Sequence, residues 1–172
     1  MRPSRDSLLI ATARLWAQRS TCSRLHVGCV VSNQGRILVQ GYNGAPAHLA
    51  HCNHSCDCGA HMRGTKVNPE NRFDSRKVRD PGHTPDCAMY KPCTISVHAE
   101  ANAIAHAAKV GVALKGAELH STHAPCYNCC MLIINAGIVD VRFSEEHRDM
   151  SGMKLLHDAG IGVMQFSGMI PA

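Results

Sequence analysis

The sequence has few aromatic residues and no long apolar run. Aromatic side chains make up 4% of the 172 residues. No apolar stretch reaches the ~20 residues that a membrane-spanning helix needs. Internal repeats and low-complexity segments are also lacking. These absences exclude collagen, coiled-coil and membrane-spanning proteins, whereas an apolar content of 45% and a charged content of 18% are typical of a globular chain.

An uninterrupted apolar core, as in a secretory signal, is missing from the first twenty residues. Arg14 and Arg19 interrupt the apolar stretch there, which favours an amphipathic helix. Runs of Lys and Arg are lacking too, although the formal net charge is +5. This balance argues against a nucleic-acid polymer and suits a phosphate-bearing ligand. We expect a cytoplasmic protein, in the host cytoplasm if the gene is viral, without membrane partners.

The length suits one domain over residues 1–172. Two short apolar runs joined by the turn at 33–35 predict a β-hairpin. Later strands alternate with helices, which predicts a three-layer α/β/α domain whose last three strands are parallel. The expected helices are 7–18, 98–110, 126–136 and 149–159, and the expected strands are 27–31, 36–41, 117–122, 138–143 and 161–166.

The first helix has apolar residues at helical spacing. We expect its buried face to be formed by Leu8, Ala11, Leu15 and Trp16.

A long insertion, about residues 44–97, separates the hairpin from the alternating part. It is rich in Gly, Pro, His, Asp, Asn and Cys and has little periodicity. Structureless loops longer than ~12–15 residues are uncommon in compact domains. The supply of Cys and His therefore favours a metal ion that orders the segment.

Thiols and imidazoles are abundant, with ten Cys and twelve His. In the absence of an export signal, metal ligation and catalysis explain them better than disulfides do. Two motifs fall at expected helix starts, H-A-E at 98–100 and P-C-Y-N-C at 125–129. Cys126 and Cys129 lie one turn apart, where the helix N-terminus favours thiolates. With His98 they give three ligands and one open position, the pattern of catalytic zinc.

Glu100 is placed close to this metal without being forced to ligate it. A carboxylate beside a zinc-bound water can accept its proton and pass protons to the substrate. H-x-E with P-C-x-x-C is the known signature of zinc nucleobase deaminases. A C-x-x-C pair alone would also suit a redox pair or half of a structural zinc site. We expect Cys130, on another helical face, to be a buried small residue.

Three stretches, 23–46, 93–108 and 116–143, carry a resemblance over about residues 5–166. They read SRLHVGCVVSNQGRILVQGYNGAP, CTISVHAEANAIAHAA and GAELHSTHAPCYNCCMLIINAGIVDVRF. The chain resembles the deoxycytidylate (dCMP) deaminases of the zinc-dependent cytidine deaminase superfamily. This implies a five-stranded mixed sheet flanked by helices, and hydrolysis of dCMP to dUMP, a supply for dTMP synthesis, with release of ammonia. It also implies zinc ligation by His98, Cys126 and Cys129, and proton transfer by Glu100.

On its residues alone, the G-Y-N-G sequence at 41–44 is typical of a turn after a strand. The resemblance implies that this segment contacts the nucleotide, and it favours a mononucleotide over a free nucleoside or tRNA. Arg24, with Ser23, is a candidate phosphate contact, although exposed surface arginines are common. Further substrate contacts implied by the resemblance come from Asn43, Ala99, His123, Ala124 and Pro125.

The resemblance also implies a second, structural zinc. Cys22 and Cys52 match the positions of two such ligands, and Cys93 is our third choice. The remaining candidates for the fourth ligand are Cys58, Cys56, Cys87 and His83.

Many relatives are regulated by dCTP and dTTP, and the dCTP effector can carry Mg²⁺. Matching effector positions are Asn43, Gly44 and Lys109, although Lys109 also suits the negative end of its helix. The family forms homo-oligomers, and the sequence leaves dimer and hexamer open. Two other functions stay open: a deaminase of a 5-substituted dCMP or another cytosine nucleotide or nucleoside, and a catalytically silent zinc module.

Overall fold

The computed structural model describes residues 2–22, 25–49, 51 and 95–168. Most of the expected insertion lies outside these ranges. Within them no helix is both long and apolar enough to cross a membrane. All the helices and strands expected from the sequence are found, with small shifts at their ends. They are α1 (Arg5–Ala17), β1 (Gly28–Asn33), β2 (Arg36–Tyr42), α2 (Ala99–Val110), β3 (Glu118–His123), α3 (Tyr127–Asn135), β4 (Asp140–Glu145), α4 (Ser151–Asp158) and β5 (Gly162–Gln165).

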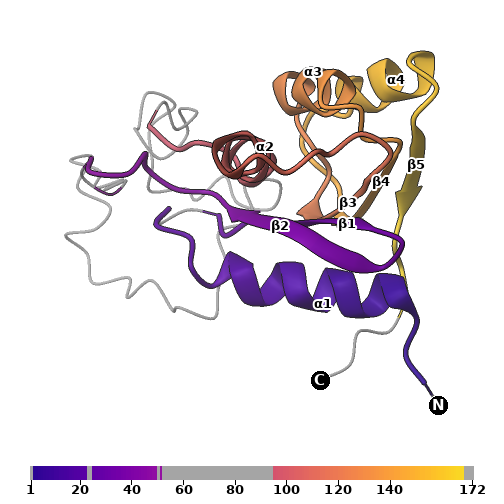
Figure 1. The fold of residues 1–172 in the computed structure, drawn as a ribbon, viewed down its shortest axis with the longest axis horizontal. Helices are drawn as coiled ribbons and strands as arrows, with labels where there is room; N and C mark the ends of the chain where they lie inside the picture. The colour runs from indigo at the N-terminus through magenta and orange to yellow at the C-terminus, as the bar shows by residue number, and fades with distance from the viewer. Residues whose placement is uncertain (1, 23–24, 50, 52–94, 169–172) are drawn as a thin grey trace, which may run out of the picture.

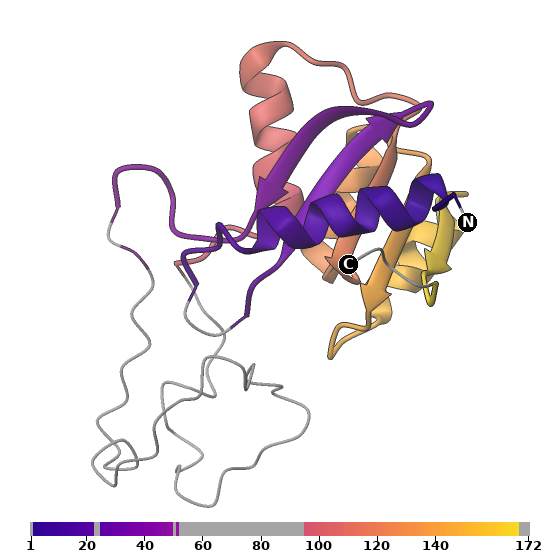
Figure 2. The ribbon, with the colours of Figure 1, turned by 90° about the horizontal axis from the view of Figure 1, so that it is seen from below.

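The five strands form one mixed sheet in the order β2-β1-β3-β4-β5. β1 runs antiparallel to β2 and β3, whereas β3, β4 and β5 are parallel, as expected from their helical crossovers. Figures 1 and 2 show α1 on one face of the sheet and α2, α3 and α4 on the other. The three-layer prediction is therefore confirmed. Gln34 and Gly35 both have positive φ, 51° and 78°, as a two-residue hairpin turn requires.

The larger apolar core lies between the sheet and the three-helix layer. Alanines on α2 allow this helix to lie close to the sheet, and Gly41 on β2 makes the approach closer still. An added Cβ at Gly41 would lie 2.2 Å from the carbonyl oxygen of Ala99. The fully enclosed members of this core include Cys29, Val31, Ala99, Ala103, Ala117, Leu119, Cys130, Ile133, Val141 and Leu156.

The prediction for the buried face of α1 was wrong. Leu8 and Leu15 are 48% and 64% exposed, and Ala11 and Trp16 are only half-buried. The side chains that α1 buries are instead Ser7, Leu9, Ile10, Ala13 and Ala17.

Close packing against β1 explains which face of α1 is buried. Both sets of residues have helical spacing, so periodicity alone does not choose between them. An added Cβ at Gly28 would lie 2.1 Å from the carbonyl oxygen of Ala13 and 2.6 Å from the nitrogen of Ala17. Small residues must therefore face the strand. Ser4 caps the helix by accepting a 3.1 Å hydrogen bond from the amide of Ser7.

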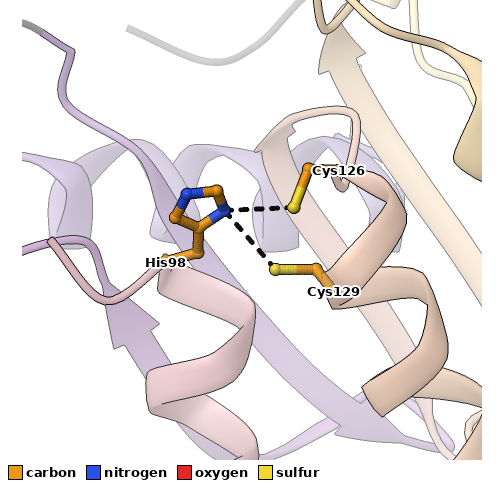
Figure 3. Close-up of side chains that lie close together, drawn as sticks. All are labelled: His98, Cys126 and Cys129. Carbon is orange, nitrogen blue, oxygen red and sulfur yellow. Dashed lines mark hydrogen bonds between the residues drawn. The ribbon is translucent and has the colours of Figure 1, made fainter. Parts of the chain in front are cut away.

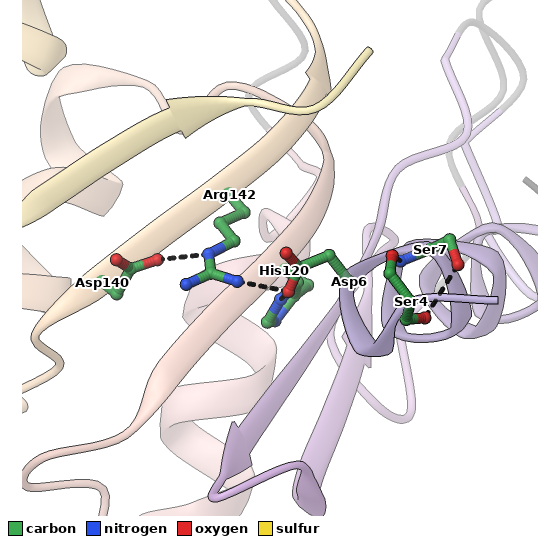
Figure 4. A network of polar contacts seen from close by, with 6 residues as sticks. All are labelled: Ser4, Asp6, Ser7, His120, Asp140 and Arg142. Atoms are coloured by element: carbon green, nitrogen blue, oxygen red, sulfur yellow. Dashed lines mark hydrogen bonds and ion pairs between the residues drawn. The ribbon is translucent and has the colours of Figure 1, made fainter. Parts of the chain in front are cut away.

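A polar network joins the start of α1 to β3 and β4 (Figure 4). The Asp6 carboxylate pairs with Arg142 and lies 3.2 Å from Nε2 of the fully buried His120. Arg142 Nε also donates to Asp140 at 2.8 Å. Burial alone would raise the pKa of Asp6, but hydrogen bonds from His120 and Arg142 outweigh it and lower that pKa. The network fixes α1 to the two strands from the face opposite α2 and α3.

The two leucines of α1 provide a direct test of its buried face. Leu9 is 5% exposed, whereas Leu15 is 64% exposed. We expect Leu9→Ala to lower the free energy of unfolding by about 2–5 kcal/mol, because it leaves a cavity against β1. Leu15→Ala should change it by less than about 0.5 kcal/mol. Urea unfolding of both variants makes the comparison, and a larger loss for Leu15→Ala would contradict this packing.

Candidate active site

The starts of α2 and α3 bring three potential metal ligands together. His98 and Cys126 are the N-cap residues of the two helices, and both have extended backbone without a side-chain capping bond. Nδ1 of His98 lies 3.3 Å from Sγ of Cys126 and 3.5 Å from Sγ of Cys129 (Figure 3). The three ligand atoms all lie within 4.8 Å of one another. These are the same three residues that the sequence predicts as ligands of one metal ion.

This donor set fits zinc. Ideal tetrahedral zinc bonds place a nitrogen and a sulfur ligand about 3.6 Å apart, close to both observed separations. A hydrogen bond from Cys129, reinforced by His98, lowers the pKa of Cys126 to about 3. The same bond raises the pKa of Cys129, which retains the shared proton. Zinc replaces such a proton when two thiolates bind it, and three protein ligands leave one position for water or substrate.

A buried carboxylate lies beside these ligands. Glu100, in the first turn of α2, is only 3% exposed. Burial raises its pKa, opposed by its own backbone amide and the charge of His98. Its Oε1 lies 3.4 Å from Oγ of Ser121 on β3. A raised carboxyl pKa suits a group that accepts and returns a proton near neutral pH.

Cys130 follows the ligand Cys129 but faces away from the metal ligands. It is fully buried, and its thiol lies 3.7 Å from the carbonyl oxygen of Pro125. Burial raises the pKa of Cys130 to about 12. The expectation of a small buried residue is confirmed, and the raised pKa keeps this thiol protonated near neutral pH.

The G-Y-N-G segment connects three parts of the chain. Oδ1 of Asn43 accepts a hydrogen bond from the amide of Val27, and Nδ2 donates to the carbonyl of Leu25, both at 2.8 Å. Gly44 forms an antiparallel bridge with Val97, the residue before His98. Asn43 thus holds the backbone before β1, and its expected contact with a nucleotide stays a prediction.

At the end of β3 a chain of hydrogen bonds leads to His123. The hydroxyl of Thr122 accepts from the amide of Gly28 at 3.2 Å and lies 3.0 Å from Nδ1 of His123. Because the amide uses Thr122 as an acceptor, the hydroxyl proton is available to Nδ1. His123 Nε2 lies 3.2 Å from Oε2 of Glu145. Sequence reasoning identified His123 but missed Thr122 and Glu145, since their contacts depend on strand register.

The remaining expected site residues have mixed outcomes. Ala99, Ala124 and Pro125 are buried next to the metal ligands in the chain, and the amide of Ala124 donates to the carbonyl of Glu145. Cys22 is 5% exposed. Lys109 is exposed in the last turn of α2, at the other end of the helix from His98. Ser23, Arg24, Cys52, Cys58 and Cys93 lie outside the described residues, as do Cys56, His83 and Cys87.

A His/Cys/Cys metal site with a buried carboxylate two residues after its histidine is the arrangement of zinc-dependent deaminases. The family described as the cytidine and deoxycytidylate deaminase zinc-binding region matches residues 3–145. Among curated proteins, a Saccharomyces cerevisiae deoxycytidylate deaminase is 37% identical over 97% of this chain and 46% of its own length. A deoxycytidylate deaminase of Mycobacterium phage D29 is 35% identical over 84% of this chain and 98% of its own.

A solved structure is similar as well. The dCMP deaminase of cyanophage S-TIM5, in complex with dCMP and dUMP, has a TM-score of 0.70 and 29% identity. The alignment covers 96% of this chain and 99% of that one. The chain therefore belongs to the cytidine and deoxycytidylate deaminase family and carries its zinc-binding deaminase domain. It spans less than half the length of the yeast relative but nearly all of the D29 phage relative.

Neighbouring cysteines on α3 test the metal site. We expect Cys129→Ala to remove one equivalent of bound zinc per chain, because Sγ of Cys129 is one of the three clustered ligand atoms. Cys130→Ala is the matched control, since its thiol faces the carbonyl of Pro125. It should keep the full zinc content, measured by metal analysis after gel filtration. Equal zinc content in the two variants would contradict the assignment.

Proposed function

We propose that the chain catalyses hydrolytic deamination of dCMP to dUMP and ammonia. The observation that carries the proposal is the proximity of His98, Cys126 and Cys129, with the buried Glu100 beside them. A purely structural zinc site would have no need of a buried carboxylate at this position. This observation favours an enzyme over a silent zinc module.

Three further observations support a mononucleotide as substrate. Curated relatives from yeast and phage are named deoxycytidylate deaminases. The S-TIM5 relative is described in complex with dCMP and dUMP, which are the substrate and the product of the proposed reaction. The G-Y-N-G segment of this chain, moreover, is connected to the start of α2 through the bridge between Gly44 and Val97.

In the proposed mechanism, His98, Cys126 and Cys129 would hold zinc, a Lewis acid that brings the pKa of bound water toward neutrality. Glu100 would accept a proton from the attacking water and deliver it to N3 of cytosine. Glu100 would then take the second proton of that water, from the hydroxyl formed on C4, and pass it to the amino group. The C4–N bond would break, the amino group would leave as ammonia, and the water oxygen would stay on C4 as the carbonyl of dUMP. Burial of Glu100 excludes bulk water from these transfers and raises its pKa toward the working range.

We propose that the base and sugar lie beside Ala99, His123, Ala124 and Pro125, with Asn43 adding a polar contact. The Thr122 and Glu145 contacts would fix the ring orientation of His123 at this site. Arg24 and Ser23 precede the backbone that Asn43 holds, at Leu25 and Val27. A guanidinium there would bind the 5′-phosphate through charge-assisted hydrogen bonds.

The other expectations from the family are also proposals. A structural zinc would be held by Cys22, Cys52, Cys93 and Cys58. Effector nucleotides, dCTP with Mg²⁺ or dTTP, would contact Asn43, Gly44 and Lys109. The protein would form a homo-oligomer, dimer or hexamer, from a single domain over residues 1–172, and its dUMP would feed dTMP synthesis.

A substrate panel tests the proposed function. Zinc-loaded protein is incubated with dCMP, CMP, deoxycytidine and 5-methyl-dCMP, with and without dCTP and Mg²⁺, and ammonia release is followed. We expect the highest kcat/KM with dCMP, because the proposed phosphate contact has no partner on deoxycytidine. Faster turnover of deoxycytidine would contradict the phosphate contact, and faster turnover of 5-methyl-dCMP would assign a modified nucleotide as substrate.

Glu100 is tested by Glu100→Gln, which keeps the size of the side chain but cannot carry the proton. We expect kcat for dCMP to fall by roughly 10²- to 10⁴-fold or more, while bound zinc is unchanged. Glu118→Gln on β3 is the control and should behave as the wild type. Near-normal turnover by a zinc-loaded Glu100→Gln enzyme would refute the assigned role.

A further inference from the structure

The hydroxyl of Ser121 is buried on the sheet face that α2 covers, beside Glu100. Ser121 is fully buried on β3, and its neighbours across the strands are the apolar Cys29 on β1 and Phe143 on β4. A hydroxyl among apolar side chains destabilises the fold unless it is hydrogen-bonded. The hydrogen-bond partners of the Ser121 hydroxyl therefore indicate why a polar residue is present at this position.

Three contacts define the position of Oγ of Ser121. It lies 3.4 Å from Oε1 of Glu100, 3.4 Å from the carbonyl oxygen of Gly28, and 3.4 Å from the amide nitrogen of His123, which donates to it. The Gly28 and His123 contacts come from backbone atoms of paired strands, so they hold the hydroxyl in place. The single hydroxyl proton is shared between Gly28 and Glu100, and a charged carboxylate attracts it more strongly than a carbonyl does.

Few other groups hold the Glu100 carboxyl. Its contacts among the described residues are its own backbone amide, the thiol of Cys129 and the hydroxyl of Ser121. As a thiolate ligand of zinc, Cys129 has no proton to donate. Ser121 is then the side chain, within this part of the chain, that still donates to Glu100.

The orientation of this carboxyl needs such a contact. The terminal torsion of a glutamate side chain has broad, weak minima, so it is set by hydrogen-bonding partners. We propose that Ser121 is a positioning residue whose buried hydroxyl holds the Glu100 carboxylate toward the metal site. This inference rests on the proposed role of Glu100 as the proton carrier. Apo contacts of this kind are often long and shorten when the substrate binds.

Three variants of Ser121 separate the hydroxyl from the volume of the side chain. Ser121→Ala removes the hydroxyl with little change in packing. Ser121→Thr and Ser121→Val have nearly equal volume and shape, and only the threonine keeps a hydroxyl. Ser32→Ala is the control: Ser32 is equally buried, on the neighbouring strand β1, and its hydroxyl has no hydrogen-bond partner among the residues that the structure describes.

Each variant is loaded with zinc, its metal content and thermal unfolding are measured, and kcat and KM for dCMP are determined. We expect Ser121→Ala and Ser121→Val to lower kcat by roughly 10- to 100-fold, with KM and zinc content unchanged. Ser121→Thr should keep a kcat at least several-fold above that of Ser121→Val, and Ser32→Ala should match the wild type.

Two results would overturn the proposal: an unchanged kcat in Ser121→Ala, or equal losses of kcat in the Thr and Val variants. Loss of zinc from Ser121→Ala would also overturn it, because the residue would then support the ligands and not Glu100. A wild-type protein that leaves dCMP unchanged contradicts the proposed function instead. The same variants are then compared on the cytosine compound of the panel that the wild type deaminates.

Discussion

The close contact between α2 and β2 determines where the chemistry of this domain takes place. Because Gly41 has no side chain, the carbonyl of Ala99 and the amide of Ala103 lie directly against the strand. This contact fixes the height and rotation of the first turn of α2. His98 and Glu100 are part of that turn or adjoin it, so the packing of one glycine positions both a ligand and the carboxylate.

The start of α3 is fixed by a separate set of contacts. The thiol of Cys130 faces the carbonyl of Pro125, and an added Cβ on Gly152 of α4 would lie 2.6 Å from this thiol. Tight packing between α3 and α4 therefore surrounds Cys130 and leaves its neighbour Cys129 facing α2. The three candidate metal ligands meet because two helices are placed independently on the same sheet. Zinc binding would reinforce an arrangement that the apolar core already defines.

The sequence predicted most of the fold because its helical and strand periods are regular after residue 98, and Gly35 and Gly111 mark a turn and a helix end. The cluster of His98, Cys126 and Cys129 was predictable because H-A-E and P-C-Y-N-C combine the spacing of metal ligands with helix starts. The buried face of α1 was not predictable, because Leu8 and Leu15 have the same helical spacing as Leu9 and Ala13. The close approach of α1 to Gly28 decides which of the two faces is buried. Ser121 and Thr122 were missed for a related reason: their partners are set by strand register, which one strand's own sequence does not contain.

Asn43 shows how a motif can serve both structure and ligand binding. An asparagine amide has two N–H donors and an oxygen with two acceptor positions, and one of each is used by Leu25 and Val27. One donor and one acceptor position remain, so a nucleotide contact would add to the structural bonds without replacing them.

The same turn is hydrogen-bonded to Val97, next to His98. A ligand that binds the segment before β1 would therefore act on backbone that Asn43 and Gly44 connect, through hydrogen bonds, to Val97 at the start of α2. This link gives a physical reason for the proposed phosphate contact to influence turnover as well as affinity.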